Sequence, residues 1–129
     1  MKLKKIIESF SGVCSVCRAK CSAADALRIA KIAKQMSFYF ESFCAEEQKL
    51  VKLYAEKDAK GEPIIKSGVP SFANASDKLE YIIEREKLLS VDVEDIESIT
   101  IKLSDLKLTD GEFSASDILS MSGIIDIEE

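Results

Sequence analysis

Residues 26–54 read ALRIAKIAKQMSFYFESFCAEEQKLVKLY, and this stretch decides the fold. Its small and apolar residues recur at every third or fourth position, which is the period of one helix face. A helix of roughly thirty residues is about 45 Å long at about 1.5 Å of rise per residue, more than the core of one small domain can cover. We therefore expect part of this face to pack against another chain. The stripe consists of Ala26, Ile29, Ala33, Met36, Phe40, Phe43, Leu50 and Tyr54, and Glu47 interrupts it.

The residues on either side of this stretch set the limits of the helix. Ser22 and Asp25 have the spacing of a capping box, which favours a helix start near Ala23. A charged turn with Gly and Pro at 57–63 indicates that the helix ends at about residue 54 or 55.

Two further helices are predicted around the long one. Residues 2–20 indicate an earlier helix, in which Gly12 is a weak point. The segment 1–56 should therefore form a helical hairpin. After a linker or short ribbon, residues 77–89 indicate a third helix with solvated charges on its outer side.

Beyond residue 90 the hydrophobic period shortens from near four to two. Ile99, Ile101 and Leu103 alternate with polar residues, a pattern typical of a half-buried strand. Leu106 and Leu108 continue this strand or open a second one after residues 104–105. The remaining expected elements are a turn at 109–111, a short helix from Ser114 or Ser116 to Met121, and a last strand at 124–127.

These patterns together predict an α+β fold in one domain of 129 residues, a length that suffices for a single core. Its expected parts are a helical hairpin (1–56), a linker or ribbon (57–76), and a helix followed by a small acidic β-containing module (77–129).

The composition argues against catalysis. The chain has no His, so it lacks the usual general base near neutral pH and the commonest metal ligand. Phosphate-binding loops, serine-hydrolase elbows, dinucleotide fingerprints and zinc-protease motifs are also missing from the sequence. We expect a protein that is not an enzyme and that carries no cofactor.

The cysteines at 14, 17 and 21 form the one cluster with potential metal chemistry. In a helix, Cys14 and Cys21 would be separated by about 10.5 Å of axial rise. Thiolates that share a zinc ion lie within about 4 Å of each other. We therefore interpret Cys14, Cys17 and Cys21 as small core residues, with a metal site and a redox pair as the alternatives.

Charge is distributed unevenly along the chain. Residues 1–60 carry 12 Lys and Arg against 7 Asp and Glu, whereas residues 61–129 carry 6 against 16. We interpret this polarity as complementarity within or between chains. The alternatives are a surface for a small anion, such as a nucleotide signal, and a nucleic-acid surface, which the lack of aromatic interleaving disfavours. The candidate anion-binding residues are Arg18, Lys20, Arg28, Lys31 and Lys34.

Aromatic residues on the long helix are candidates for a protein interface. Phe40 and Phe43 fit the apolar stripe, whereas Phe38 and Tyr39 fall outside it and could anchor a partner. Burial beneath the C-terminal module is the alternative for this second pair. The complete candidate interface is Phe38, Tyr39, Phe40, Phe43, Leu50 and Tyr54.

The layout of the chain resembles small uncharacterised proteins of tailed phages and prophages of Gram-positive bacteria. The likeness covers about residues 25–129, and it implies a non-enzymatic protein in the host cytoplasm or in a virion. It assigns no functional residues, and the three N-terminal cysteines are not part of it. The motifs that carry it are Leu50-x-x-x-Tyr54-x-x-Lys57-Asp58-x-x-Gly61-x-Pro63, Leu88-Leu89-x-Val91-x-Val93 and Ile99-x-Ile101-x-x-x-Asp105-Leu106.

We therefore expect a phage-type protein that self-associates through its long helix and binds a protein partner, as an assembly factor, a minor virion component or an inhibitor of a host protein. No segment reads as a secretory signal or a membrane span. The alternative functions are capture of a small anion and metal-stabilised binding of nucleic acid.

Overall fold

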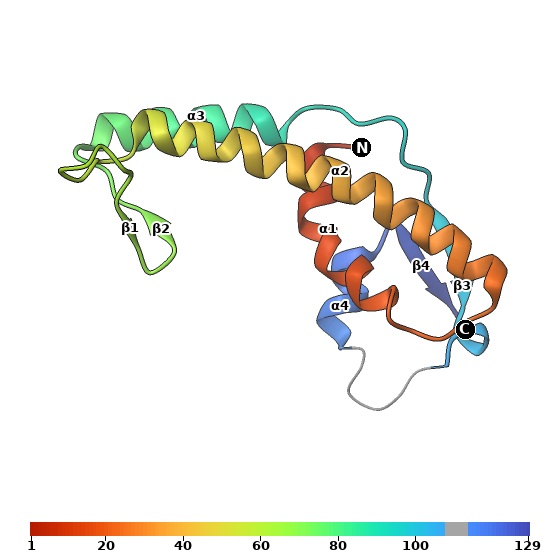
Figure 1. Ribbon diagram of the computed structural model, residues 1–129. Helices are drawn as coiled ribbons and strands as arrows, with labels where there is room; N and C mark the ends of the chain where they lie inside the picture. The colour runs from red at the N-terminus through yellow and green to blue at the C-terminus, as the bar shows by residue number, and fades with distance from the viewer. Residues whose placement is uncertain (108–113) are drawn as a thin grey trace. The chain divides into compact units, whose positions relative to one another are not determined.

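The computed structural model describes residues 1–107 and 114–129, and within them it confirms the α+β class (Figure 1). The turn expected at 109–111 and the apolar residue Leu108 lie outside the described residues. The helices are α1 (Leu3–Val16), α2 (Ala23–Tyr54), α3 (Ala75–Leu89), α4 (Ala115–Met121) and a 3-10 turn (Leu103–Asp105), and the strands are β1 (Ile65–Lys66), β2 (Val69–Pro70), β3 (Ile99–Lys102) and β4 (Ile125–Glu128).

The chain divides into two compact units, and the boundary falls inside α2. Unit 1 comprises residues 1–40 and 92–129, and unit 2 comprises residues 41–91. The hydrophobic pattern of the sequence continues across this boundary, because both parts of α2 carry the same apolar stripe.

The limits of α2 agree with those expected from the sequence. At its start, the backbone N–H of Asp25 donates to Ser22 Oγ over 3.2 Å. After its end, Asp58 Oδ1 accepts the backbone N–H groups of Lys60 and Glu62, and Gly61 has a φ of +79°, which closes the turn. Although α2 has 32 residues, neither it nor another helix in the described segments is apolar enough to cross a membrane.

The core of unit 1 joins both ends of the chain. β3 and β4 pair in parallel, with Ile99 opposite Ile125 and Lys102 opposite Glu128. α4 lies within the connection between them, since parallel strands cannot be joined by a tight turn. The fully buried apolar side chains of this core are Ile6, Val13, Val16, Met36, Ile101, Met121, Ile124 and Ile125.

α1 ends earlier than the expected limit of residue 20. Its last turn tightens, because the N–H groups of Arg18 and Ala19 bond to carbonyls three residues back. The backbone carbonyl of Lys20 then accepts the N–H of Lys107 over 2.8 Å. An extended pairing at Lys20 is incompatible with a continuing helix, and so Cys17 and Cys21 lie outside α1.

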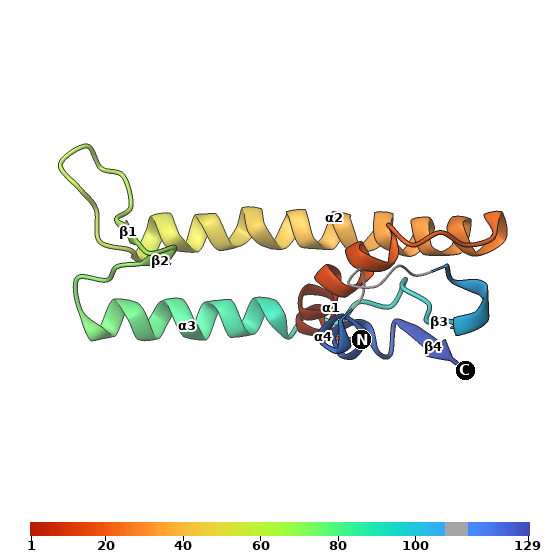
Figure 2. The same ribbon diagram turned by 90° about the horizontal axis from the view of Figure 1, so that it is seen from below.

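Gly12 lies where α1 contacts α4, so it does more than lower the helix propensity of α1. α1 packs mainly against α4, and Figures 1 and 2 both show these two helices side by side. A Cβ built on Gly12 would lie 2.3 Å from Ser120 Oγ and 2.6 Å from the carbonyl oxygen of Asp117. The two helices therefore approach as closely as they do because this position has no side chain.

The overpacking introduced by Gly12→Ala should cost about 2–3 kcal/mol, the upper part of the usual range, because the new Cβ meets backbone as well as a side chain. This cost opposes a gain of about 1 kcal/mol from the better helix propensity of Ala. We expect a net loss of about 1–2 kcal/mol in the free energy of unfolding. The double variant Gly12→Ala, Ser120→Ala should recover part of the loss, because the contact with the Asp117 carbonyl remains. Urea denaturation followed by circular dichroism measures these differences.

The matched control is Ser9→Ala, which removes an atom from the same face of α1 instead of adding one. Ser9 is fully buried, and its hydroxyl has no hydrogen-bond partner within the described residues. Removal of this hydroxyl should therefore leave the free energy of unfolding unchanged or raise it slightly. Equal stability of Gly12→Ala and the wild type would contradict the close crossing of α1 and α4.

Candidate functional site

The apolar stripe of α2 is covered largely by its own chain. In unit 1, Ile29 and Met36 are buried, and the ring of Phe40 stacks on that of Phe10 with 4.7 Å between centroids. In unit 2, Phe43 is buried, while Leu50 and Tyr54 are half-buried. The expectation that the length of α2 forces its stripe onto another chain is therefore not supported, because folded segments of the same chain cover most of it.

The two aromatic residues outside the stripe have different environments. Phe38 is 65% exposed, and its ring meets that of Tyr39 edge-on at 5.4 Å. The Tyr39 hydroxyl donates to the carboxylate of Asp95, and this hydrogen bond raises the pKa of Tyr39. Phe38 is thus open to a partner, whereas the polar end of Tyr39 is held by its own chain.

Glu47, the interruption in the stripe, fastens α3 to α2 within unit 2. Arg85 Nε donates to Glu47 Oε2 over 2.7 Å, and this bond is the main cause of the raised pKa of Arg85. The Arg85 guanidinium also lies 5.4 Å from the ring centroid of Phe43. The polar residue in the apolar pattern is therefore explained by a charged partner from α3.

Unit 2 buries few of its apolar side chains. Among residues 41–91, all of which are described, the buried hydrophobic residues are Phe43, Ala55 and Leu89. A larger group of aliphatic side chains in the same unit is between 44% and 67% exposed. This group comprises Leu53, Ile65, Val69, Leu79, Ile82, Ile83 and Val91.

The sequence pattern predicts no interface at these exposed residues. On α3, the inner positions Tyr81, Arg85 and Leu88 lie roughly half a turn around the helix from the exposed aliphatic positions, and both sets contain apolar residues. The two sets differ in that α2 lies against the inner positions, and this cannot be read from the sequence of α3. The one available signal was the surplus of aliphatic residues on α3 beyond the single face that a neighbour can cover.

A cleft of about 350 Å³ opens within unit 2 between α2, the β1–β2 ribbon and α3. Tyr81 lines it and packs on Phe72, with 5.2 Å between ring centroids. Burial, followed by the nearby charge of Glu47, raises the pKa of Tyr81. The other lining residues are Glu47, Gln48, Val51, Lys52, Pro63, Ile65, Gly68 and Pro70.

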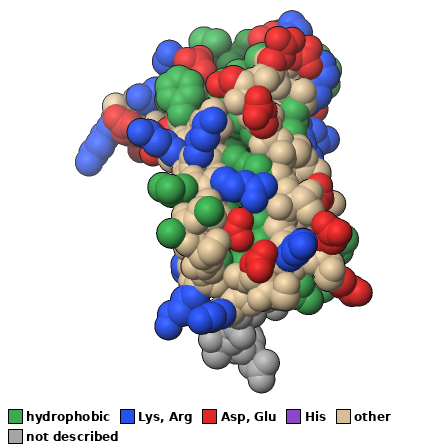
Figure 3. Space-filling view, turned by 90° about the vertical axis from the view of Figure 1, so that its right-hand side faces the viewer, with side chains coloured by type: hydrophobic (Ala, Val, Ile, Leu, Met, Phe, Trp, Pro, Cys, Tyr) green, Lys and Arg blue, Asp and Glu red, His purple; other side chains and the backbone are tan. Residues whose placement is uncertain are grey.

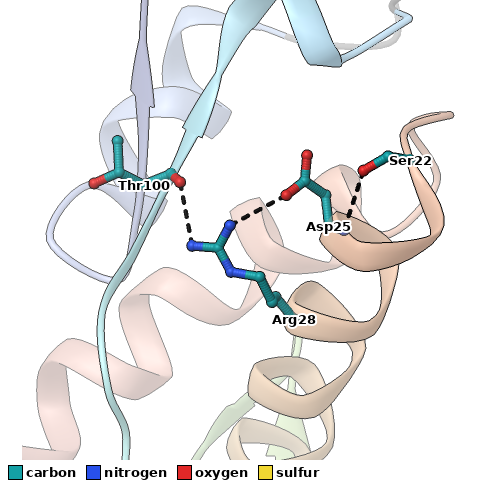
Figure 4. A network of polar contacts seen from close by, with 4 residues as sticks. All are labelled: Ser22, Asp25, Arg28 and Thr100. Atoms are coloured by element: carbon teal, nitrogen blue, oxygen red, sulfur yellow. Dashed lines mark hydrogen bonds and ion pairs between the residues drawn. The ribbon is translucent and has the colours of Figure 1, made fainter.

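The candidate anion-binding residues do not converge. Arg28 Nη1 donates to Asp25 over 3.1 Å, and Nη2 donates to the carbonyl of Thr100 over 3.3 Å (Figure 4). Lys31 shares a cleft of about 260 Å³ with Arg28, but Asp95 and Glu97 also line it. Two carboxylates in this cleft oppose the binding of an anion.

The other basic candidates lie outside that cleft. Arg18, Lys20 and Lys34 are exposed and do not line it. On the face drawn in Figure 3, Lys and Arg side chains are interspersed with Asp and Glu. This mixture is typical of a solvated surface rather than of a phosphate-binding patch.

The N-terminal cysteines differ in exposure. Cys14 and Cys21 are half-buried, whereas Cys17 is exposed at the end of α1, so the interpretation as a core residue is wrong for Cys17. Burial of the thiol and the neighbouring Cys14 raise the pKa of Cys17, and Arg18 opposes this shift. Within residues 1–107 and 114–129, no three Cys, Asp or Glu side chains are grouped so that they could hold a metal ion.

Comparisons with protein-family models, with curated proteins and with solved structures find no match. The resemblance in layout to phage proteins therefore stays a prediction. The exposed aliphatic side chains of unit 2 form the candidate interaction site. The exposed ring of Phe38 is a separate candidate in unit 1.

We expect Arg85→Ala to lower the free energy of unfolding by about 1–2 kcal/mol, because it removes a partly exposed ion pair and a cation–π contact. Arg85→Lys should lower the free energy of unfolding by about half as much, since Lys keeps the charge but not the planar guanidinium. Urea denaturation measures both. Lys87→Ala is the control, because the exposed ion pair of Lys87 with Glu84 should contribute little to the free energy of unfolding. If Arg85→Ala were as stable as the wild type, the contact with Glu47 would not hold α3 against α2.

We expect Cys17 to react slowly with iodoacetamide near neutral pH, because its raised pKa leaves less thiolate than in an ordinary cysteine. Arg18→Ala should slow the reaction further, since Arg18 is the group that lowers this pKa. Mass spectrometry of the modified peptide gives the rate at each pH. A rate above that of free cysteine would revive the redox interpretation of the Cys14–Cys17 pair.

Proposed function

We propose that this chain is a non-enzymatic protein-interaction module that self-associates and binds a protein partner through unit 2. The observation that carries the proposal is the excess of exposed over buried aliphatic side chains in residues 41–91. Scattered apolar residues are normal on protein surfaces, but a concentration of them in one small unit is typical of an interaction surface.

The comparison with unit 1 supports this assignment. Unit 1 buries side chains from α1, α2, α4 and both strands of its parallel sheet in one core. Unit 2 has two helical segments and a ribbon with two residues in each strand. Because a pair of helices can bury only one face of each helix, the outer faces need either polar residues or a partner.

The proposed setting follows from the phage-like layout. We place the protein among factors of phage or prophage origin that act as assembly factors, minor virion components or inhibitors of a host protein. The absence of His from the sequence favours binding over catalysis. The exposed ring of Phe38 is a second candidate anchor for a partner, because aromatic side chains often contribute strongly to interfaces.

Self-association is tested by size-exclusion chromatography with light scattering over a range of protein concentrations. We expect a mass that rises from that of the 14.3 kDa chain to a multiple of it as the concentration increases. A double substitution in unit 2, Leu79→Gln with Ile82→Gln, should abolish this rise. The reason is that it replaces exposed apolar groups by polar groups of similar size.

The matched control is Leu119→Gln with Ile118→Gln, a pair of exposed apolar residues on α4 in unit 1. This pair should leave the mass unchanged. A wild-type chain that stays monomeric at high micromolar concentration would contradict self-association. Equal effects of the two double variants would contradict its location in unit 2.

A further inference from the structure

α3 presents two faces with different surroundings inside unit 2. Tyr81, Arg85 and Leu88 line clefts with α2 or bond to it. Leu79, Ile82 and Ile83 follow the spacing i, i+3, i+4 on a different side and are 58%, 44% and 44% exposed. We call these three residues the aliphatic face of α3. Figure 2 shows α3 running antiparallel to the last part of α2, with no further helix of unit 2 beside it.

Charged residues stand at equal distances on either side of this face. Lys78 precedes Ile82 by four residues, and Glu86 follows Ile82 by four residues. Both side chains are exposed, and among the described residues neither forms an ion pair within unit 2. By contrast, the neighbouring Lys87 is paired with Glu84 over 3.0 Å.

We propose that the aliphatic face of α3 binds the same face of a second copy of this chain, with the two α3 helices antiparallel and a twofold axis at Ile82. This inference rests on the proposed function and specifies the surface and the partner. Ile82 packs against the partner's Ile82, and Leu79 and Ile83 extend the contact on either side.

The placement of charge selects this arrangement. A twofold axis at Ile82 brings Lys78 opposite the partner's Glu86, and Glu86 opposite the partner's Lys78. A parallel pair of helices would instead place each Lys78 beside the partner's Lys78 and each Glu86 beside the partner's Glu86. Since like charges at neighbouring helix positions repel, the sequence of α3 is complementary to itself only in the antiparallel direction.

Charge exchange tests the proposed register. We expect K78E to weaken the dimer roughly tenfold in sedimentation equilibrium, since it creates two like-charge pairs related by the twofold axis. E86K should have a similar effect. The double variant K78E/E86K should associate nearly as well as the wild type, because the exchange restores both opposite-charge pairs. A double variant weaker than either single variant would overturn the proposal.

K66E is the matched control for net charge. Lys66 is an exposed residue of β1 in the same unit, and its substitution changes the charge by the same amount as K78E. It should leave the dimer constant within about twofold, because it lies outside the proposed contact. Weakening equal to that of K78E would show that general repulsion, not the register of α3, explains the result.

A cysteine on the proposed axis gives an independent test of geometry. Ile82→Cys should form a disulfide-linked dimer rapidly under mild oxidation, because each new thiol faces its own copy. Glu80→Cys, an exposed position on another side of α3, should crosslink slowly, and so should the wild type with its own four cysteines. Equal crosslinking rates for the two variants would contradict a twofold axis at Ile82.

The outcomes separate this inference from the proposed function. If the wild type associates but neither K78E nor Ile82→Cys behaves as expected, the α3 contact is wrong and self-association uses another surface of unit 2. If the wild type is monomeric at all concentrations, both self-association and the α3 contact are wrong.

Discussion

The constraint on which this account depends is that α3 has one helical neighbour within unit 2. A helix covered on one side needs solvated residues on the other, but α3 carries apolar residues on both. The contact with α2 is also partly polar, because Arg85 reaches Glu47 and covers the ring of Phe43. The outer aliphatic side chains therefore remain exposed at a cost in free energy that a partner surface would remove.

Unit 1 has the opposite organisation. Its parallel pair of strands brings residues near 100 and 125 together, and its helices cover that pair from both ends of the chain. α1 and α4 cross at Gly12, where the missing side chain permits an approach that a larger residue would prevent. Unit 1 therefore buries apolar side chains from both ends of the chain in one core, whereas unit 2 leaves most of its large aliphatic side chains exposed.

Local signals predicted the elements well. The cap at Ser22 and the turn after α2 gave the limits of that helix, and alternation identified β3 around Ile99. Ser114 forms a reciprocal capping box with Asp117 at the start of α4, as the sequence suggested for one of two serines. These signals involve residues close together in the chain, so they can be recognised without knowledge of the fold.

Long-range pairings were not predictable in the same way. Glu47 appears as a defect in the stripe until Arg85 is placed beside it, and Gly12 appears as a weak point until α4 is packed on it. For the same reason, the candidate interface predicted from the sequence, on α2, differs from the one that the structure suggests, on α3. Phe40 and Phe43 are covered by distant segments, whereas the aliphatic face of α3 is not. Among the aromatic candidates, Phe38 is the one whose side chain is mostly exposed, because it lies opposite the stripe.

We propose that another chain completes unit 2. Amide hydrogen exchange measured by mass spectrometry at low and high protein concentration tests it most directly, because it locates any protection along the chain. We expect peptides from α3 to exchange more slowly at high concentration, while exchange in peptides from α1 and α4 is unchanged. Exchange in α3 that is independent of concentration, and as slow as in the core of unit 1, would contradict this proposal.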